Sequence, residues 1–558
     1  MPTTIRSFLF FFILIAVLQV SVKAQTPQSP PIQPQAPTKD KSSDTAILKE
    51  IVVSGRKLAF QHMADRLVVN ISSNRLFKTA ANTYDILKNI PGLQVTGDGT
   101  LLLSGRITPT IFIDGKPSPM SPEELQNYLS SLSPDLIASI EIITNPSSKY
   151  DGEQKGIIDI KLKRDMTLGW RGNLSTNIQQ NDYTLADNNF LLLYKTPKLT
   201  YTARLGYTTG TKIQFVYQGL QHLANTNIMK TNTTALGGNN NINYQLGVDY
   251  NFKKNQHIEI VGRAYQLNRT INTNNTLNTT DSSTKYLISN TQTRNHAGPT
   301  QDNYAVNLNY TGQFGKSQLE ISGTLLKIKN RQKEDIQTQN TVTGDLEDYW
   351  KTSLKNDILI RTAQADLSRN AGKTKLSIGA KYAFTTTRND LRYDTLNRIN
   401  IFATDSSRTN NFQYDEYIAA GYASLERKID KLSYSVSLRA EHTHSIANTI
   451  TNDQVTERNY LTWLPSLDLT YTINENTQAH LSWSRRMTRP NFTQLNPFRF
   501  YNSPLNYYVG NPWLQPSTTN LISASFSQKV FNITFNFGRE SDPMTRYPEY
   551  DSATNILQ

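Results

Sequence analysis

From residue 165 onward, apolar and polar side chains alternate in run after run along the chain. Each run spans about ten residues, the length of a strand with one face in lipid and the other toward a wet lumen. A soluble β-sandwich also alternates, but over shorter strands. The apolar positions are Tyr201, Ala203, Leu205 and Tyr207; Ile242, Tyr244, Leu246, Val248, Tyr250 and Phe252; Tyr304, Val306, Leu308 and Tyr310; Leu376, Ile378, Ala380, Tyr382 and Phe384; Leu432, Tyr434, Val436, Leu438 and Ala440; Leu467, Leu469, Tyr471 and Ile473; and Phe531, Ile533, Phe535 and Phe537.

Seven short polar connections join these runs, at residues 196–198, 253–255, 315–317, 370–372, 429–431, 474–476 and 527–529. Outer-membrane barrels have tight turns on the periplasmic side and long loops outside. We expect such loops at Asn268–Thr300 and Arg388–Asn411, which are dense in Asn, Thr, Ser and Asp. One strand near Leu168–Ile178 and two strands for each turn give about 15 strands, whereas a closed single-chain bacterial barrel has an even number.

The stretch from Asn82 to Lys163 has a different texture and predicts a small folded α+β unit. A helix is expected over Tyr84–Ile90, because a cap at residue 82 or 83 precedes it and Pro91-Gly92 stops it. Residues 121–124 form a capping box, and Ser133-Pro134 repeats the cap. Short strands are predicted at residues 93–95, 100–103, 110–113, 139–144 and 156–163.

The first 24 residues have the organisation of a secretory signal peptide. One basic residue, Arg6, precedes the uninterrupted apolar run Phe8–Leu18, and small residues end at Ala24. This run is too short to span a bilayer as a helix. We therefore expect export of the chain and cleavage near Ala24.

Residues 25–45 are rich in Pro, Gln, Ser and Thr and bury too little apolar surface to fold, so we interpret them as a flexible tether. An island of β-forming residues follows at 46–55. It is either the first strand of the folded unit or a segment that adds to the sheet edge of another protein. Its central residues are Ile47, Leu48, Lys49, Glu50, Ile51, Val52, Val53 and Ser54.

Composition narrows the chemistry. The chain has no cysteine, which excludes disulfides and thiolate metal sites. Its net charge of +13 is spread along the chain without basic stretches interleaved with aromatic residues, so we do not expect nucleic-acid binding. Lumen and rim cations of this kind steer anionic ligands or contact acidic surface lipids. No Walker A loop, Gly-x-Ser-x-Gly elbow or His-Glu-x-x-His helix occurs, and we predict neither an enzyme nor a cofactor.

Two histidines form the strongest metal candidate in the sequence. His442 and His444 lie two residues apart, so they share one face of a strand and can hold one ion together. In the phase set by Leu432–Ala440, that face points outward near the upper end of the strand. We therefore favour an interfacial position for the pair over a metal site.

The run Ile140–Asp151 (IEIITNPSSKYD), followed by Gly156–Ile160 (GIIDI), resembles the plug domain of TonB-dependent outer-membrane receptors. It looks most like the branch that is common in Bacteroidetes, and Ile111–Pro117 (IFIDGKP) agrees. The resemblance fixes order and spacing across residues 82–163. It implies a plug motif at Arg106, Asp114, Gly115, Glu141, Asn145, Pro146, Tyr150 and Gly156.

A second segment looks like a strand and external loop of the same receptors. It comprises Trp483–Pro490, Leu495–Phe498 and Val509–Pro516. The aromatic residues of this loop either form a platform for a ligand or, more commonly, order a long loop. They are Tyr501, Tyr507, Tyr508 and Trp513.

The resemblance implies a signal peptide at 1–24, a tether at 25–45, a TonB-box-like segment at 46–55, a plug at 56–164 and an outer-membrane barrel at 165–558. The predicted fold class is mainly β: a transmembrane antiparallel β-barrel, incomplete at about 15 strands, with a small N-terminal α+β plug domain. The implied function is uptake of a ligand across the cell outer membrane, driven by a TonB-type energy-transducing protein that captures residues 47–54. A siderophore, a glycan, a peptide and a cobalamin remain open as ligands.

Two alternatives remain from other functional classes: a passive pore or surface adhesion barrel, and an outer-membrane enzyme. The odd strand count and the polar end at Gln558, which lacks an aromatic last residue, lead us to expect that C-terminal strands are missing. We then expect an open, C-shaped sheet whose unpaired edges are costly in lipid, and a chain that is not a competent transporter by itself.

Overall fold

The computed structural model describes residues 60–557 apart from short gaps, the longest at 72–76, 119–124, 164–167, 223–226 and 552–555. Residues 56–558 form one compact unit, which contains both the plug and the barrel. Outside the described residues lie the predicted signal peptide, tether and TonB-box-like segment, together with Arg106 and the capping box at 121–124. In the part that is described, no helix has the length and apolar character to cross a membrane.

The plug is a six-stranded sheet in the order β1-β2-β7-β8-β5-β6, with helix α3 and a separate β3–β4 pair. As predicted, α3 begins after Asn82, whose side chain accepts a hydrogen bond from the Asp85 amide at 2.9 Å. Its apolar face is fully buried in the plug core through Ile86 and Leu87. The elements are β1 (Phe60–His62), β2 (Leu67–Asn70), α3 (Thr83–Lys88), β3 (Leu93–Val95), β4 (Leu101–Leu103), β5 (Thr110–Ile113), β6 (Lys116–Pro117), η1 (Pro134–Leu136), β7 (Ile137–Ile143) and β8 (Ile157–Leu162).

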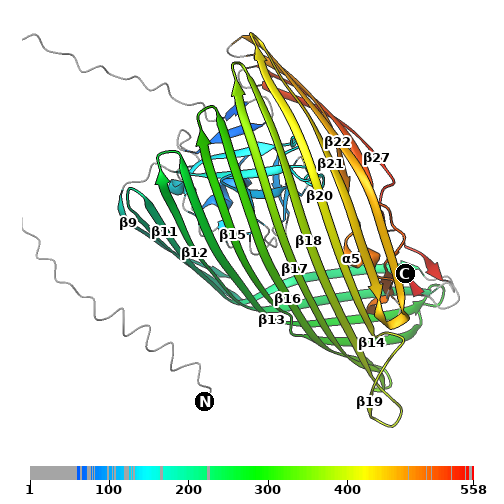
Figure 1. The fold of residues 1–558 in the computed structure, drawn as a ribbon. Helices are drawn as coiled ribbons and strands as arrows, with labels where there is room; N and C mark the ends of the chain where they lie inside the picture. Colours follow the sequence, from blue (N-terminus) through cyan, green and yellow to red (C-terminus); the bar gives the residue numbers. More distant parts are fainter. Residues whose placement is uncertain are drawn as a thin grey trace, which may run out of the picture. The chain divides into compact units, whose positions relative to one another are not determined.

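Long antiparallel strands form the barrel wall around the plug (Figure 1). They are β9 (Gly169–Gln180), β10 (Thr184–Lys195), β11 (Leu199–His222), β12 (Asn227–Lys253), β13 (Gln256–Asp281), β14 (Leu287–Ala297), β15 (Thr300–Phe314), β16 (Ser317–Asn340), β17 (Leu346–Ala371), β18 (Thr374–Leu396), β19 (Phe402–Thr404), β20 (Asn410–Ile429), β21 (Leu432–Thr449), β22 (Gln454–Asn474), β23 (Thr477–Thr488), β26 (Ser517–Gln528) and β27 (Phe531–Ser541). The connections also contain η2 (Ile450–Asn452), α5 (Phe492–Leu495) and a small sheet of β24 (Arg499–Ser503), β25 (Asn506–Val509), β28 (Tyr550–Asp551) and β29 (Ile556–Leu557).

Among the described residues the wall has fifteen strands, close to the sequence prediction of about fifteen. The segments β14 and β15 count as one strand, because both pair with β13 and both pair with β16 at successive heights. In the same way β19 and β20 both pair with β18. The tight turns separate β10 from β11, β12 from β13, β15 from β16, β17 from β18, β20 from β21, β22 from β23 and β26 from β27.

The strand order is circular, from β10 through β27 to β9, which corrects the expectation of an open, C-shaped sheet. The seam still differs from the rest of the wall. The barrel closes where β27 lies beside β9. An odd number of antiparallel strands makes β9 and β27 run in the same direction. Outward-facing side chains of these two strands are strongly exposed, with Leu174 at 76% and Phe535 at 77%.

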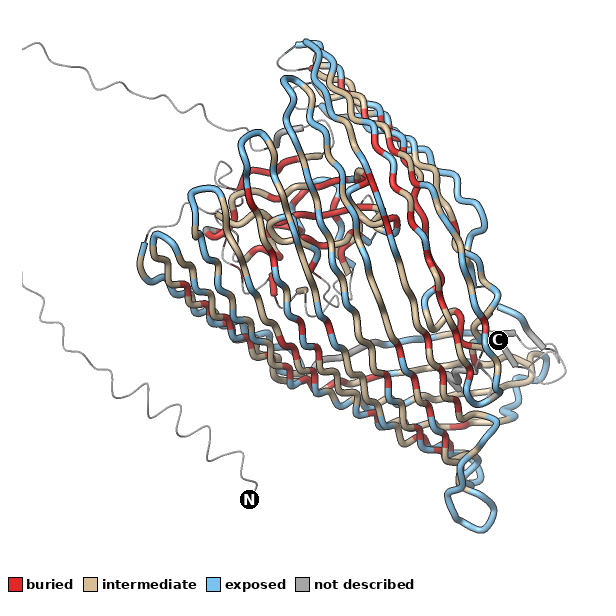
Figure 2. Tube along the Cα trace, viewed as in Figure 1, coloured by how far each residue is buried: buried red, intermediate tan, exposed pale blue. Residues whose placement is uncertain are grey.

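The wall is apolar outside and polar inside. On β12, Leu246 is 66% exposed while Asn241 and Asn239 on the opposite face are buried. Figure 2 shows buried positions recurring along strands that are otherwise exposed, in contrast to the buried core of the plug. This is the alternation that the sequence predicted for a wall between lipid and lumen.

Two predicted loops are wrong. In the segment Asn268–Thr300 the strand β13 continues to Asp281 and β14 follows, and in Arg388–Asn411 the strand β18 continues to Leu396. Backbone pairing in water does not require apolar side chains, and the Thr residues of these segments favour extended structure. The loops are therefore short, and long polar hairpins carry strands of up to 27 residues beyond the apolar band.

Candidate functional site

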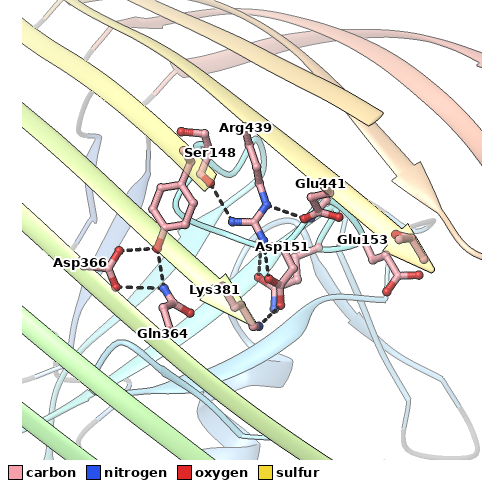
Figure 3. A network of polar contacts seen from close by, with 12 residues as sticks. Ser148, Asp151, Glu153, Gln364, Asp366, Lys381, Arg439 and Glu441 are labelled. Carbon is pink, nitrogen blue, oxygen red and sulfur yellow. Dashed lines mark hydrogen bonds and ion pairs between the residues drawn. The ribbon is translucent and has the colours of Figure 1, made fainter. Parts of the chain in front are cut away.

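The plug meets the barrel wall through the loop between β7 and β8, residues 144–156. Pro146 ends the β7 ladder, and a turn follows in which the Tyr150 amide donates to the Ser147 carbonyl at 3.1 Å. A second turn joins the Gln154 amide to the Asp151 carbonyl at 3.0 Å. Together these turns hold residues 147–153, here called the docking loop, against the inward faces of β18, β21 and β23 (Figure 3).

Asp151 is the central anion of the docking loop. Its carboxylate forms ion pairs with Lys381 of β18 at 2.6 Å and with Arg439 of β21 at 3.0 Å. Arg439 is fully buried, and its guanidinium also lies 5.0 Å from the ring centroid of Tyr422. One plug carboxylate thus joins cations from two barrel strands that are separated by β20.

Glu441 is the matching anion on the wall. Its carboxylate contacts the guanidinium groups of Arg439 and Arg489, and it accepts a hydrogen bond from the Gly152 amide at 3.0 Å. Arg489 in turn pairs with Glu153 of the docking loop at 3.1 Å. Cations and anions therefore alternate along the network, from Lys381 at one end to Glu153 at the other.

This charge network is balanced: three cations (Lys381, Arg439 and Arg489) face three anions (Asp151, Glu153 and Glu441). A further buried cation, Arg486, donates to the carbonyls of Ser147 and Asp151 at 3.3 and 3.4 Å. A buried pair of charges contributes little net stability, but removal of one partner leaves the other uncompensated in a medium of low dielectric constant. The network therefore sets one position for the loop rather than supplying most of the binding energy.

Main-chain contacts bring the loop closer to the wall than side chains alone allow. The Gly152 carbonyl accepts from the Met487 amide at 3.0 Å, and the Ser148 amide donates to the Ser437 hydroxyl at 3.2 Å. A Cβ on Gly152 would lie 2.5 Å from Cδ1 of Leu464. Glycine is required here because of this close approach.

The plug touches a second part of the wall by different chemistry. Leu191 and Leu193 of β10 are 4% and 8% exposed, and both belong to the hydrophobic core of the plug. Beside this contact, Arg204 of β11 stacks on the ring of Tyr128 at 4.2 Å. A cavity of about 1170 Å³ lies between plug and wall, lined near the tight turns by residues such as Lys195, Asn370 and Lys428.

The predicted plug motif marks positions that shape the plug. The Asp114 carboxylate accepts from the Leu162 amide, and the Gly115 amide donates to Asp159, both at 2.9 Å. Glu141 pairs with Arg66 at 2.7 Å, and the Gly156 carbonyl accepts from Thr110 at 2.9 Å. Two members face the docking region: Asn145 contacts the Ser484 hydroxyl, and buried Pro146 ends the strand. Tyr150 packs edge-on against Phe112, with ring centroids 5.5 Å apart.

The aromatic residues of the predicted ligand loop differ from one another in burial and in their neighbours. Tyr507 is buried, Tyr508 lies under Arg546 at 4.7 Å, and Trp513 is 67% exposed. Consecutive residues of a strand face opposite sides, so Tyr507 and Tyr508 of β25 do not share one face. Tyr501 pairs with Tyr507 across the hairpin. The ligand platform stays a prediction.

His442 and His444 lie on the outward face of β21, as their phase predicted. The Nε2 atom of His442 is 2.6 Å from the Asn459 side-chain oxygen, and His444 faces Glu457 at 3.6 Å. Within the described residues no group of three or more His, Cys, Asp or Glu side chains is arranged to hold a metal.

Sequence reasoning missed the charge network. Its wall members have a signal in the sequence, since Arg439 and Glu441 are charges on the inward face of β21 among serines and threonines, and Arg489 lies in the Trp483–Pro490 segment. Their plug partners are distant in the sequence: 288 residues separate Asp151 from Arg439, and 336 separate Glu153 from Arg489. Local patterns carry no information on pairs of that separation.

Comparison with known proteins agrees with this architecture. The family model of the TonB-dependent Receptor Plug Domain matches residues 65–156, and that of the Outer membrane protein beta-barrel family matches residues 315–558. No curated protein matches the chain.

Solved structures share the fold. The unliganded ferric citrate transporter FecA is similar with 13% identity and a TM-score of 0.54, over 84% of this chain and 68% of that one. The siderophore receptor PirA of Acinetobacter baumannii is similar with 14% identity and a TM-score of 0.53, over 88% of this chain and 74% of that one. The ferripyoverdine receptor of Pseudomonas aeruginosa is similar with 10% identity and a TM-score of 0.52, over 89% and 66%. The chain therefore carries a TonB-dependent receptor plug domain inside a barrel of the outer membrane protein β-barrel family.

Proposed function

We propose that this receptor takes up a ligand across the outer membrane by releasing the docking loop from the wall when a TonB-type protein pulls on the N-terminal segment. The observation that carries the proposal is the balanced charge network between the docking loop and strands β18 and β21 together with Arg489, which directly follows β23. Both halves of this network carry charges that water solvates well once they separate. The contact is therefore specific when closed and can be opened without exposing a large apolar surface.

The segment Ile47–Ser54 is the proposed handle for the TonB-type protein. Its β-forming residues suit addition to a sheet edge, where main-chain hydrogen bonds supply affinity. It comes just before the plug in the sequence, so a pull on it is transmitted to the plug sheet, in which β7 and β8 are the central strands. The loop residues Tyr501, Tyr507, Tyr508 and Trp513 are proposed to contact the ligand on the external side.

A binding competition tests the proposal. A peptide covering residues 47–54 should bind the C-terminal domain of a TonB-type partner, and a peptide with Ile51→Pro and Val53→Pro, which removes two backbone donors, should not. Uptake should then stop in cells that lack the partner. Absence of peptide binding together with energy-independent passage would favour a passive pore or adhesion barrel. Hydrolysis of a lipid or peptide that is lost on changing one lumen Ser, His or Asp would favour an enzyme.

A further inference from the structure

One buried cation in the plug–wall cavity is outside the charge network. Arg204 of β11 is 5% exposed, and its Nε and Nη1 atoms are buried with no hydrogen-bond partner in the part of the chain that is described. It stacks on Tyr128 of the plug at 4.2 Å. A ring satisfies the face of a guanidinium but not its N–H groups, and buried donors without partners are costly. Arg204 also lines the plug–wall cavity, so its guanidinium group lies next to space that a bound group can occupy.

The strand register places a second arginine in the same row. Arg204 pairs with Gln245 of β12, and Gln245 pairs with Arg263 of β13. Neighbouring strands lie about 4.8 Å apart, so the backbones of the two arginines are about 10 Å apart. The side-chain amide of Gln245 comes from the strand between them. Their strand neighbours Leu205 and Leu246 are exposed outward, so the row faces inward, and all three residues line the cavity. Arg263 also reaches the plug, because its Nη1 donates to the Ser118 hydroxyl at 2.7 Å.

The row formed by Arg204, Gln245 and Arg263 across β11, β12 and β13 is electropositive, because the nearest wall carboxylates lie at other levels of the strands. On the inward faces of β10, β12 and β13 the carboxylates Asp187, Asp249 and Glu259 each lie four residues from it, which is about 13 Å along a strand. Glu259 is already paired with Lys116 of the plug. The plug carboxylates that line the cavity are also engaged, as Asp159 is with Lys161 at 2.6 Å. At the level of the row itself, the described residues of β10–β13 include no carboxylate.

We propose that Arg204, Gln245 and Arg263 form a binding site for an oxyanion, a carboxylate or phosphate group, in the cavity between the plug and strands β11–β13. Guanidinium groups bind both oxyanions through paired N–H···O bonds, and the amide of Gln245 adds a donor between them. The site deepens the proposed function and rests on it for its role: it gives an anionic ligand a place beside the plug on its way to the tight-turn side. Binding itself does not depend on the TonB-type partner.

Calorimetric titration of the full-length receptor in detergent tests the site with inorganic phosphate and, separately, with succinate. We expect saturable binding of at least one probe. Arg204→Met should weaken it by about tenfold or more, because a charge-assisted contact is lost, and Arg204→Lys by less. The matched control is Arg361→Met, which removes a barrel arginine stacked on Phe384 and outside the cavity lining. It should bind like the unchanged receptor.

A second variant guards against misfolding of the first. Gln245→Met keeps the charge and size of the wall and should weaken binding several-fold, with unchanged heat-modifiable gel mobility as the folding control. Saturation by phosphate but not succinate assigns the site to phosphate groups, and the converse assigns it to carboxylates. The proposal is overturned when neither probe saturates, or when Arg204→Met and Gln245→Met bind as tightly as Arg361→Met. The peptide competition above can succeed in either case, so the two failures are distinguishable.

Discussion

The plug touches the barrel in two places with opposite chemistry. On one side, Asp151 and Glu153 enter a network of ion pairs with β18, β21 and Arg489, the residue after β23. On the other, Leu191 and Leu193 of β10 complete the plug core. Ion pairs and hydrogen bonds demand one geometry, whereas apolar contact tolerates sliding and repacking. The docking loop therefore sets the position of the plug and the β10 side attaches it, and release at the docking loop is the proposed step.

The largest effect is expected from Glu441→Leu. This change removes the anion that Arg439, Arg489 and the Gly152 amide share, and leaves two buried cations without it. Breaking a buried pair in this way costs about 3–5 kcal/mol. Hydrogen exchange of residues 148–153 should become fast while that of β7 and β8 stays slow. Unchanged protection of the docking loop would show that the network does not hold it.

Leu191→Ala tests the other side of the comparison. Loss of a buried leucine side chain costs about 2–5 kcal/mol, depending on how far the cavity collapses. Thermal unfolding followed by near-ultraviolet circular dichroism should show that the plug unfolds at a lower temperature. Below that temperature the docking loop should still be protected from hydrogen exchange. Leu205→Ala is the control, because Leu205 faces outward and is 42% exposed. If loop and core lose protection together, the two contacts are not independent.

Gly152→Ala should have an intermediate effect. The added Cβ meets Leu464 at 2.5 Å, and overpacking of this kind costs about 1–3 kcal/mol. Faster exchange of the Met487 amide, which donates to Gly152, is the readout. Combining the change with Leu464→Ala should restore much of the protection, as contacting sites couple. If the two changes lower the protection additively, the strain does not arise from the contact between residues 152 and 464.

Lys149→Ala should have the smallest effect. Its ion pair with Glu320 at 2.8 Å belongs to the same loop, but the two side chains are 45% and 38% exposed. Exposed pairs contribute about 0–1 kcal/mol because water and salt screen them. Loop exchange should change little, and less still in high salt. A loss as large as that of Glu441→Leu would mean that burial does not distinguish the pairs.

Sequence patterns predicted the elements of this protein better than the contacts between them. The cap at Asn82, the strands β7 and β8, the outward phase of Leu246 and the fifteen-strand wall all follow from local chemistry with periods of two or 3.6 residues. Strand ends were missed where polar hairpins continue past the apolar band, because pairing there depends on the partner strand. The network of Asp151 and Arg439 was missed because its members meet only after both domains have folded.

Chemical labelling of Ser148 tests release of the docking loop most directly. Ser148 is 2% exposed under the wall, and the chain has no cysteine, so Ser148→Cys gives a single buried thiol. Cells should be grown on a nutrient source that a deletion strain cannot use, with and without the proton-motive force. We expect a permeant maleimide to label Ser148→Cys several-fold faster in energised cells, and Lys149→Cys, its exposed neighbour, equally fast in both. Equal protection of Ser148→Cys in both states during uptake would contradict release of the loop from the wall.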